Sequence, residues 1–358
     1  MGTTDGAAPS GGRVRKYPRV NPERNEGATL GACPKPKIPP RRVRVEDRLG
    51  SLSGIPLRLR GRHEQSTRHS PIFYNRLMPE LPEVETIALG VHARVRGDRI
   101  VEAWFSSYPQ PFKTPPLEQS KGLEGRTILA VHRTGKHIVC ELGIAKSRGK
   151  ADPAKPDAQW IVHLGMTGRL LVTTRDSPVA NHTHARLTLE SGREIRFVDP
   201  RRFGRLEFRE LGSTAGFQGA GKEPLTIDAD QFAALFRGRK LAIKAALLNQ
   251  SLLTGVGNIY ADESLFRAGI RSSRRAGRLT KAELERLRLS LRAVLEHAIQ
   301  LGGSSVSDYV DANGVRGFFQ LEHCVYMRTG QPCRHCDTPI RRIVVAGRGT
   351  HYCPQCQH

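Results

Sequence analysis

The sequence predicts an α+β protein in which an antiparallel β-sandwich domain precedes a helical domain and a small cysteine module. Three patterns lead to this prediction. Residues 99–212 hold short apolar stretches separated by turn-forming residues, residues 224–302 place apolar side chains at helical spacing, and residues 324–358 hold four closely spaced cysteines. The β pattern by itself fits either a sandwich or a barrel.

Residues 1–77 predict no folded domain. They carry 16 Lys and Arg against 6 Asp and Glu, include six prolines between residues 18 and 40, and show no regular apolar period. Such a composition buries too little apolar surface to offset chain entropy, so we expect a disordered basic extension. It lacks the apolar centre of a secretory signal, and its prolines and glycines break the amphipathic helix of an organelle presequence. A third interpretation is that the extension is untranslated or removed.

The folded part of the chain is expected to begin at Met78. Pro82, followed by Glu83 and Glu85, indicates the first turn of a helix, because proline fits that turn and acids there face the positive end of the helix dipole. Residues 145–159, rich in Lys, Pro and Ala, predict an exposed hairpin insertion. The predicted strands are Arg126–His132, His137–Leu142, Trp160–Leu164, Arg169–Thr173, Ala185–Leu189, Glu194–Val198 and Arg205–Glu210.

The helical region has one strong start signal. Thr280 and Glu283 form a capping-box pattern, and Leu279 and Leu284 are placed as its hydrophobic staple. Apolar residues follow at helical spacing as far as Ile299, so a long helix is expected here. Upstream, two shorter helical runs flank the glycine-rich turn at residues 254–258.

The C-terminal cysteines predict a metal site. Cys333 and Cys336 are separated from Cys353 and Cys356 by 16 residues, a spacing typical of a four-cysteine zinc site. Four thiolates complete a tetrahedron, so one structural Zn²⁺ is expected, against the alternative of four incidental thiols. The intervening arginines, among them Arg348, suggest a hairpin that presents cations. The odd total of seven cysteines argues against a secreted disulfide framework and favours a reducing cytoplasm.

The charge of the chain predicts a polyanionic partner. The net charge is +23 with a sequence pI of about 10.4, and a field of this strength concentrates phosphate chains around a protein. No run approaches the length of about 18 apolar residues that a membrane span needs. Net charge alone does not separate nucleic acid from an anionic membrane surface or an acidic protein.

Several ordered motifs make the chain similar to a known family, the bacterial formamidopyrimidine-DNA glycosylases, which remove oxidised purines from DNA. The resemblance spans residues 78–358. It implies a catalytic β-sandwich domain at 78–212, a helix-two-turn-helix DNA-binding domain at 213–323 and a zinc finger at 324–358. The motifs are MPELPEVET at 78–86, Lys136, HLGMTG at 163–168, HTH at 182–184, DPRRFG at 199–204, GVGNIY at 255–260 and the cysteine module with Arg348.

The resemblance implies that Pro79 is the nucleophile. An imine with an opened sugar needs an amine that is partly unprotonated at neutral pH, and an α-amino group of pKa about 8 meets this need better than a lysine at about 10.4. Glu80 is then the acid/base that assists opening of the sugar, and Glu83 supports the pocket. Lys136 corresponds to the lysine near the lesion phosphate, used in β-elimination, and Arg348 to the arginine of phosphate clamping and δ-elimination.

This chemistry places a condition on the chain. Within the 358-residue polypeptide, Pro79 is a tertiary amide without a nucleophilic lone pair. We therefore expect translation to start at Met78 with removal of that methionine, or a protease to expose Pro79. The alternative interpretation of Pro79 is a structural proline at the start of a strand, and the alternative for Lys136 is a solvated surface charge.

The resemblance also implies a set of DNA contacts. Met166, Arg201 and Phe203 match the three side chains that fill the gap left by an extruded base, which offsets part of the unstacking cost. Met166 and Phe203 could alternatively be core residues. Further DNA contacts are implied for His182, Arg239 and Asn258, the last in a turn whose backbone N–H groups suit an anion.

These inferences predict a bifunctional DNA glycosylase and apurinic/apyrimidinic lyase that acts on 8-oxoguanine and formamidopyrimidines. Its partner is damaged double-stranded DNA, and we expect a monomer in the bacterial cytoplasm, bound to the nucleoid through DNA. Two alternatives remain at this point: a non-catalytic zinc-ribbon relative that only binds DNA, and an oxidised-pyrimidine glycosylase of the endonuclease VIII branch.

Overall fold

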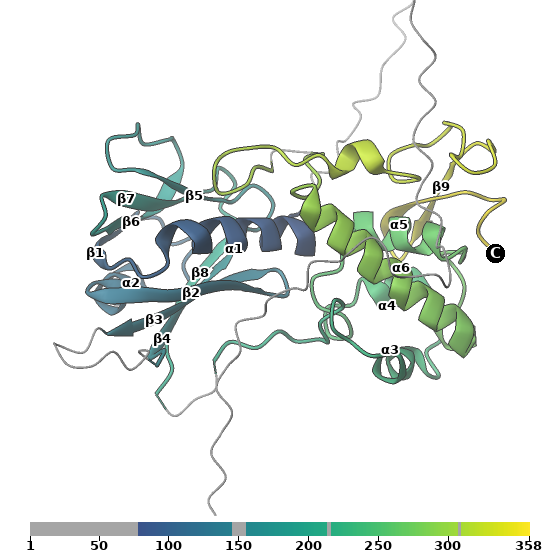
Figure 1. The fold of residues 1–358 in the computed structure, drawn as a ribbon, viewed down its shortest axis with the longest axis horizontal. Coiled ribbons are helices and arrows are strands. Elements are labelled where there is room, and N and C mark those ends of the chain that lie inside the picture. The colour runs from purple at the N-terminus through teal and green to yellow at the C-terminus, as the bar shows by residue number, and fades with distance from the viewer. Residues whose placement is uncertain (1–77, 145–154, 213–215, 307–308) are drawn as a thin grey trace, which may run out of the picture. The chain divides into compact units, whose positions relative to one another are not determined.

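The computed structural model describes residues 78–144, 155–212, 216–306 and 309–358 (Figure 1). The predicted disordered extension at 1–77 and most of the predicted insertion at 145–159 lie outside these residues. None of the helices in the described ranges has the length and apolarity that crossing a membrane requires.

The first element is helix α1 (Leu81–Val95), which starts where the proline and acid pattern predicts. Pro82 lies in its first turn, and the side chains of Glu80 and Glu83 form a reciprocal capping box. The helix packs against β2 (Arg126–Thr134) and against α6 (Lys281–Gln300), so it joins the β-sheet region to the helical region (Figure 1). The start of α1 therefore lies where the two regions meet.

Two four-stranded antiparallel sheets follow, and all seven predicted strands are present. One sheet has the order β1-β6-β7-β5 and the other β2-β3-β4-β8. Buried side chains of both sheets and of α1 form a single core, with Trp160 and Phe197 among its largest members. The described residues thus form a sandwich. The remaining bounds are β1 Ile100–Phe105, β3 His137–Ile144, β4 Ala158–His163, β5 Arg169–Thr174, β6 Thr183–Leu189, β7 Arg193–Val198 and β8 Arg205–Glu210.

Two elements of this region were absent from the sequence prediction. Strand β1 buries only Ile100 and Ala103 among its six residues, so it lacks the alternation that marks a half-buried strand. Helix α2 (Pro116–Leu123) buries only Gln119 and Leu123. Short elements with so few buried positions leave little periodic signal.

The helical region contains α3 (Ala229–Phe236), α4 (Ile243–Leu247), α5 (Asn258–Arg267) and α6. The predicted capping box is confirmed, since Thr280 Oγ1 accepts from the Glu283 backbone N–H at 3.2 Å and the Glu283 carboxylate accepts from the Thr280 N–H at 2.8 Å. These helices share a second core that includes Tyr260 and Phe319. The two shorter helices that flank residues 254–258 are α4 and α5, as expected.

The C-terminal module is built around a hairpin. Strands β9 (Arg341–Val345) and β10 (Arg348–Tyr352) pair antiparallel, with Arg348 opposite Val345. The two turn residues, Ala346 and Gly347, have φ of 48° and 74°, the combination that a two-residue type I′ turn requires. Arg348 therefore follows directly from the tip of the hairpin.

Candidate active site and nucleic-acid interface

Two buried carboxyl groups, those of Glu80 and Glu83, lie at the start of α1. Glu83 accepts hydrogen bonds from the backbone N–H groups of Ser304, at 2.7 Å, and Glu80, at 2.9 Å, and from the Tyr260 hydroxyl. Glu80 Oε1 accepts from the Ile259 N–H at 3.3 Å, whereas its Oε2 is buried with no hydrogen-bond partner among the described residues. Glu80 thus has one oxygen still able to exchange a proton.

The turn before α5 is shaped to receive Glu80. A Cβ atom on Gly257 would lie 2.0 Å from the carboxyl carbon of Glu80, so only glycine allows this close approach. The neighbouring Gly255 carbonyl accepts a hydrogen bond from the Leu81 N–H at 3.0 Å. The glycine-rich motif at 255–260 therefore does more than break the helix: it packs directly against the predicted catalytic residue.

Burial controls the protonation of both carboxyl groups. It raises the pKa of Glu80 from 4.5 to about 7, an effect opposed by the charge of Lys136 and strengthened by that of Glu83. Burial also raises the pKa of Glu83, while the hydrogen bond from Tyr260 opposes the rise. The pKa of Glu80 applies to a chain in which Pro79 carries no charge, and a protonated N-terminal imino group beside it would lower this pKa.

The sequence-predicted Lys136 lies within electrostatic reach of this pair, and Arg348 lies within electrostatic reach of Lys136. Lys136 is half-buried in the turn between β2 and β3, and burial lowers the pKa of its ammonium, an effect that the charges of Glu80 and Glu83 oppose. The charge of Arg348 lowers the pKa of Lys136 further. Pro79, half-buried, directly precedes Glu80. The structure thus gathers these predicted residues at one place, from α1, the β2–β3 turn and the C-terminal hairpin.

Replacement of Glu80 by Gln tests the raised pKa. Because the pKa is higher in the folded than in the unfolded chain, the folded state holds more protons between pH 4.5 and about 7, and stability falls as pH rises through this range. We expect Glu80→Gln to be more stable than the wild type at about pH 8, by up to about 3 kcal/mol, and nearly equal at about pH 4.5. Urea unfolding at both pH values measures this. Glu118→Gln on the exposed side of α2 is the control, and an identical pH dependence in wild type and Glu80→Gln would contradict the assignment.

A buried ion pair that the sequence analysis missed holds the hairpin. Lys244 Nζ lies 2.7 Å from Asp262 Oδ1, with both side chains fully buried. The same ammonium donates to the Gly349 carbonyl at 3.0 Å and to Thr350 Oγ1 at 2.8 Å. It therefore fixes the two residues that follow Arg348. Neither Lys244 nor Asp262 belongs to a local pattern that signals a pair, because 17 positions and a turn separate them.

We expect Lys244→Met to destabilise the protein by about 3–5 kcal/mol, since it leaves the Asp262 carboxylate buried without its partner. Chemical denaturation measures the loss. The double variant Lys244→Met/Asp262→Asn should recover part of it, because no unpaired charge is then buried. Equal stability of Lys244→Met and wild type would refute this account of the hairpin.

The predicted gap-filling residues are brought together by two loops. Met166 lies between β4 and β5, and Arg201 and Phe203 lie between β7 and β8. The fully buried Asp199 carboxylate joins the loops, because it accepts from the Thr167 hydroxyl and, at 2.8 Å, from the Gly204 N–H. Phe203 is 47% exposed, so the core alternative fails for this residue. Met166 is half-buried.

The other three residues predicted to contact DNA lie at separate places in the structure. Asn258 is buried at the start of α5, and its Nδ2 donates to the Gly349 carbonyl at 3.1 Å, which connects it to the hairpin of Arg348. His182 is exposed with φ of 65°, close in sequence to β6. Arg239 is exposed, and its Nε donates to the Leu235 carbonyl at 2.6 Å. Asn258 is thus hydrogen-bonded to an element that carries a predicted catalytic residue, whereas the hydrogen bond of the Arg239 side chain stays within its own segment.

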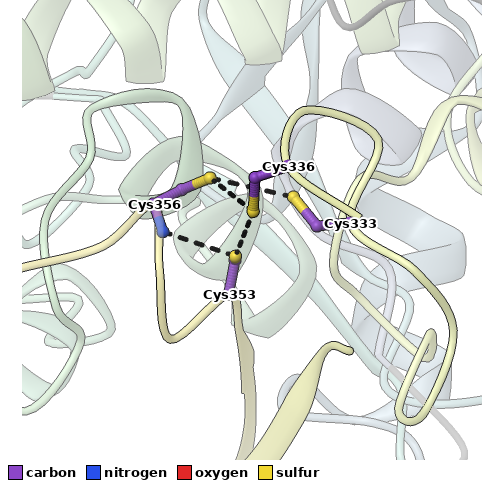
Figure 2. A group of neighbouring side chains, drawn as sticks. All are labelled: Cys333, Cys336, Cys353 and Cys356. Carbon is purple, nitrogen blue, oxygen red and sulfur yellow. Dashed lines mark hydrogen bonds between the residues drawn. The ribbon is translucent and has the colours of Figure 1, made fainter. Parts of the chain in front are cut away.

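The four predicted metal ligands converge. Figure 2 shows the sulfur atoms of Cys333, Cys336, Cys353 and Cys356 gathered at one point, all within 4.8 Å of one another. The Sγ–Sγ distances from Cys356 to Cys333 and to Cys336 are 3.8 and 3.4 Å, close to the edge of about 3.8 Å in a tetrahedron with Zn–S bonds of about 2.3 Å. The donor set therefore fits a tetrahedral metal ion.

Comparison with known proteins identifies the class. Three domain models match in order: the formamidopyrimidine-DNA glycosylase N-terminal domain at residues 78–206, the H2TH domain of the same enzymes at 220–310, and the zinc finger found in FPG and IleRS at 330–358. This order defines a DNA-repair glycosylase with a zinc finger. The chain belongs to the formamidopyrimidine-DNA glycosylase family, and the predicted family and fold class are confirmed.

Individual relatives agree with this assignment. The formamidopyrimidine-DNA glycosylase of Solibacter usitatus is 44% identical over 280 residues, which cover 78% of this chain and 99% of the relative. The structure of a mutant of the Lactococcus lactis FPG in complex with Fapy-dG-containing DNA is 33% identical with a TM-score of 0.68, and the match covers 78% of this chain and 100% of that one. The structure of the Thermus thermophilus protein is 39% identical with a TM-score of 0.66, with 78% and 98% covered.

Proposed function

We propose that this protein excises oxidised purines, among them 8-oxoguanine and formamidopyrimidines, and then cleaves the DNA strand by β,δ-elimination. The observation that carries the proposal is the Glu80 carboxyl group. It follows Pro79 directly, is buried, has one oxygen without a hydrogen-bond partner among the described residues, and has a pKa raised to about 7. The Pro79 nitrogen must be unprotonated and neutral to attack the sugar, so this pKa holds in the reactive state, and a carboxyl group of this pKa can both donate and accept a proton at neutral pH.

Each predicted catalytic residue has its own role in the proposed reaction. The unprotonated nitrogen of Pro79 attacks the C1′ carbon of the sugar as the C1′–base bond breaks, and the departing base takes up the proton that this nitrogen releases. The nitrogen lone pair then expels the ring oxygen, to which Glu80 donates a proton as the sugar opens. The product is an iminium ion between Pro79 and C1′. Loss of the 3′ phosphate by β-elimination and of the 5′ phosphate by δ-elimination then cuts the strand on both sides. Lys136 and Arg348 bind the phosphates and assist these steps.

Pro79 must carry a free imino group for this chemistry. We propose that synthesis begins at Met78 and that the methionine is removed, with proteolytic exposure of Pro79 as the alternative route. Two observations support an N-terminus here: the family model begins at residue 78, and 78% of this chain covers 99% of the Solibacter relative. N-terminal sequencing of the native protein checks the proposal, and a start upstream of Pro79 would contradict it.

The remaining roles concern binding. Met166, Arg201 and Phe203 enter the gap left by the extruded base, while His182, Arg239 and Asn258 contact the DNA. A single Zn²⁺ on the four cysteines would hold the hairpin of Arg348 in place and supply no catalytic step, because four protein ligands leave no open position. We further propose a cytoplasmic monomer with three domains at 78–212, 213–323 and 324–358, acting on damaged double-stranded DNA.

Borohydride trapping separates this function from the two alternatives. A chain that begins at Pro79 is mixed with duplexes containing 8-oxoguanine or thymine glycol in the presence of borohydride. We expect a covalent adduct, formed faster on 8-oxoguanine. Absence of an adduct on both duplexes favours a DNA-binding relative without catalysis, and faster trapping on thymine glycol favours an oxidised-pyrimidine enzyme.

A further inference from the structure

The loop between β7 and β8 carries two stacked arginine–aromatic pairs. Arg201 Cζ lies 4.8 Å from the centre of the Phe203 ring, within the loop itself. Arg202, the residue between them, has its Cζ 4.9 Å from the centre of the Tyr108 ring, which belongs to the segment between β1 and α2. The loop is thus tied to a segment about ninety positions away in the sequence.

Arg202 adopts a conformation that needs such support. Its φ of 57° places it in the left-handed region, which is unfavourable for a residue with a Cβ atom. A loop keeps this conformation only where surrounding contacts hold it. The backbone N–H of Arg202 is bonded to the Asp199 carbonyl at 3.2 Å, and the guanidinium stacks on Tyr108. Residues Arg201 and Phe203 flank this strained position on either side.

The ring of Tyr108 packs on a buried histidine that is itself held by hydrogen bonds. Its ring packs edge-to-face on His184, with 5.9 Å between the ring centres. His184 is buried, with Nδ1 3.1 Å from Ser106 Oγ and Nε2 3.1 Å from the Asp199 carbonyl oxygen. The same residue, Asp199, holds the loop through its carboxylate. Tyr108 nevertheless remains 54% exposed, so its ring is accessible to the guanidinium of Arg202 at the surface.

We propose that Tyr108 is a positioning residue that acts through Arg202 to hold the loop at 199–204 in the shape that presents Arg201 and Phe203 to DNA. The inference rests on the proposed function, because it assigns Tyr108 to the step in which the damaged base leaves the duplex. A cation–aromatic contact suits this place, since it holds a charged side chain in water without burying it. The left-handed position and the stacked ring together fix the loop before DNA arrives, so less conformational entropy is lost on binding.

The test compares variants of a chain that begins at Pro79. In Tyr108→Ala we expect single-turnover release of 8-oxoguanine to fall on the order of twofold to fivefold, the scale of one cation–π contact at an exposed site. At a preformed abasic site no purine has to be extruded. The fold-loss in the rate of strand scission there should be less than half of the fold-loss in the rate of purine release. Tyr108→Phe keeps the ring and should restore release. Trp104→Ala, at an exposed position of β1, is the matched control for loss of an aromatic side chain.

A double-mutant cycle shows whether Tyr108 acts through Arg202. The losses in Tyr108→Ala and Arg202→Gln should not add in the double variant. Additive losses would overturn the proposal, because they would mean that Tyr108 contacts DNA independently. Release at the wild-type rate in Tyr108→Ala, or no rescue by Tyr108→Phe, would overturn it as well.

A second measurement tests the role of Tyr108 without depending on base excision or strand cleavage. The fluorescence of 2-aminopurine opposite an abasic site reports how side chains enter the gap, and it requires no bond cleavage. We expect Tyr108→Ala to diminish the change in fluorescence seen with wild-type protein, and an undiminished change would overturn the proposal. If wild-type protein released no base, the proposed function would fail, while this signal would still decide the role of Tyr108.

Discussion

A chain that begins at Pro79 should cleave lesion-containing DNA, whereas the 358-residue chain should not. The two differ in one functional group at the site: a free secondary amine in the shorter chain and a tertiary amide in the longer one. An amide nitrogen has no basic lone pair to attack the sugar carbon. Loss of an essential nucleophile lowers catalysis far more than loss of a binding contact, so we expect a difference on the order of a thousandfold or more in strand scission.

Controls must show that the longer chain still binds DNA. The affinity of both chains for a duplex with an uncleavable abasic analogue, measured at one salt concentration, serves this purpose. A shorter chain in which Pro79 is replaced by glycine with an acetylated amine blocks the nitrogen without adding residues. Cleavage by this blocked chain at the rate of the unblocked one would exclude Pro79 as the nucleophile.

Most of the fold could be predicted from the sequence because its strands and its longest helix leave strong local patterns in the chain. The seven strands between residues 126 and 210 have buried positions and turn residues at their ends, and α6 begins at its capping box. The missed elements, β1 and α2, bury few side chains. Their positions depend on the two sheets and on α1, so a local window contains little information about them.

The candidate site was only partly predictable, and the limit has a physical cause. Motif residues such as Glu80 and Lys136 could be named, but the pKa of Glu80 depends on burial against Gly257, far away in the sequence. Lys244 and Asp262 meet across the turn between α4 and α5, and Tyr108 and Arg202 come from segments about ninety positions apart. A lysine or tyrosine taken alone is most often a surface residue, and only the folded chain shows its partner.

Loss of the metal site should have the second large effect. Among the described residues the module has a very small core of its own: Phe266, Cys324, Val325, Cys333, Ile340 and Cys353. So little apolar burial contributes only modest stability, whereas a structural zinc ion in small domains contributes about 10–16 kcal/mol of apparent binding free energy. We therefore expect Cys353→Ser to reduce bound zinc well below one per chain and to unfold the hairpin of Arg348.

The functional consequence should be loss of DNA binding while the β-sandwich remains folded. The two sheets and α1 have a separate core, so their unfolding by urea should change little in Cys353→Ser. Release of Arg348 from its fixed position would remove the charge-assisted phosphate contact that we propose for it, which corresponds to a loss of DNA affinity of about tenfold or more. Cys140→Ala, at a buried thiol in the sandwich core, is the control and should retain one zinc ion. Full zinc content in Cys353→Ser would contradict the assignment of Cys353 as a required ligand. Loss of zinc with unchanged DNA affinity would show that the Lys244–Asp262 pair holds the hairpin without the metal.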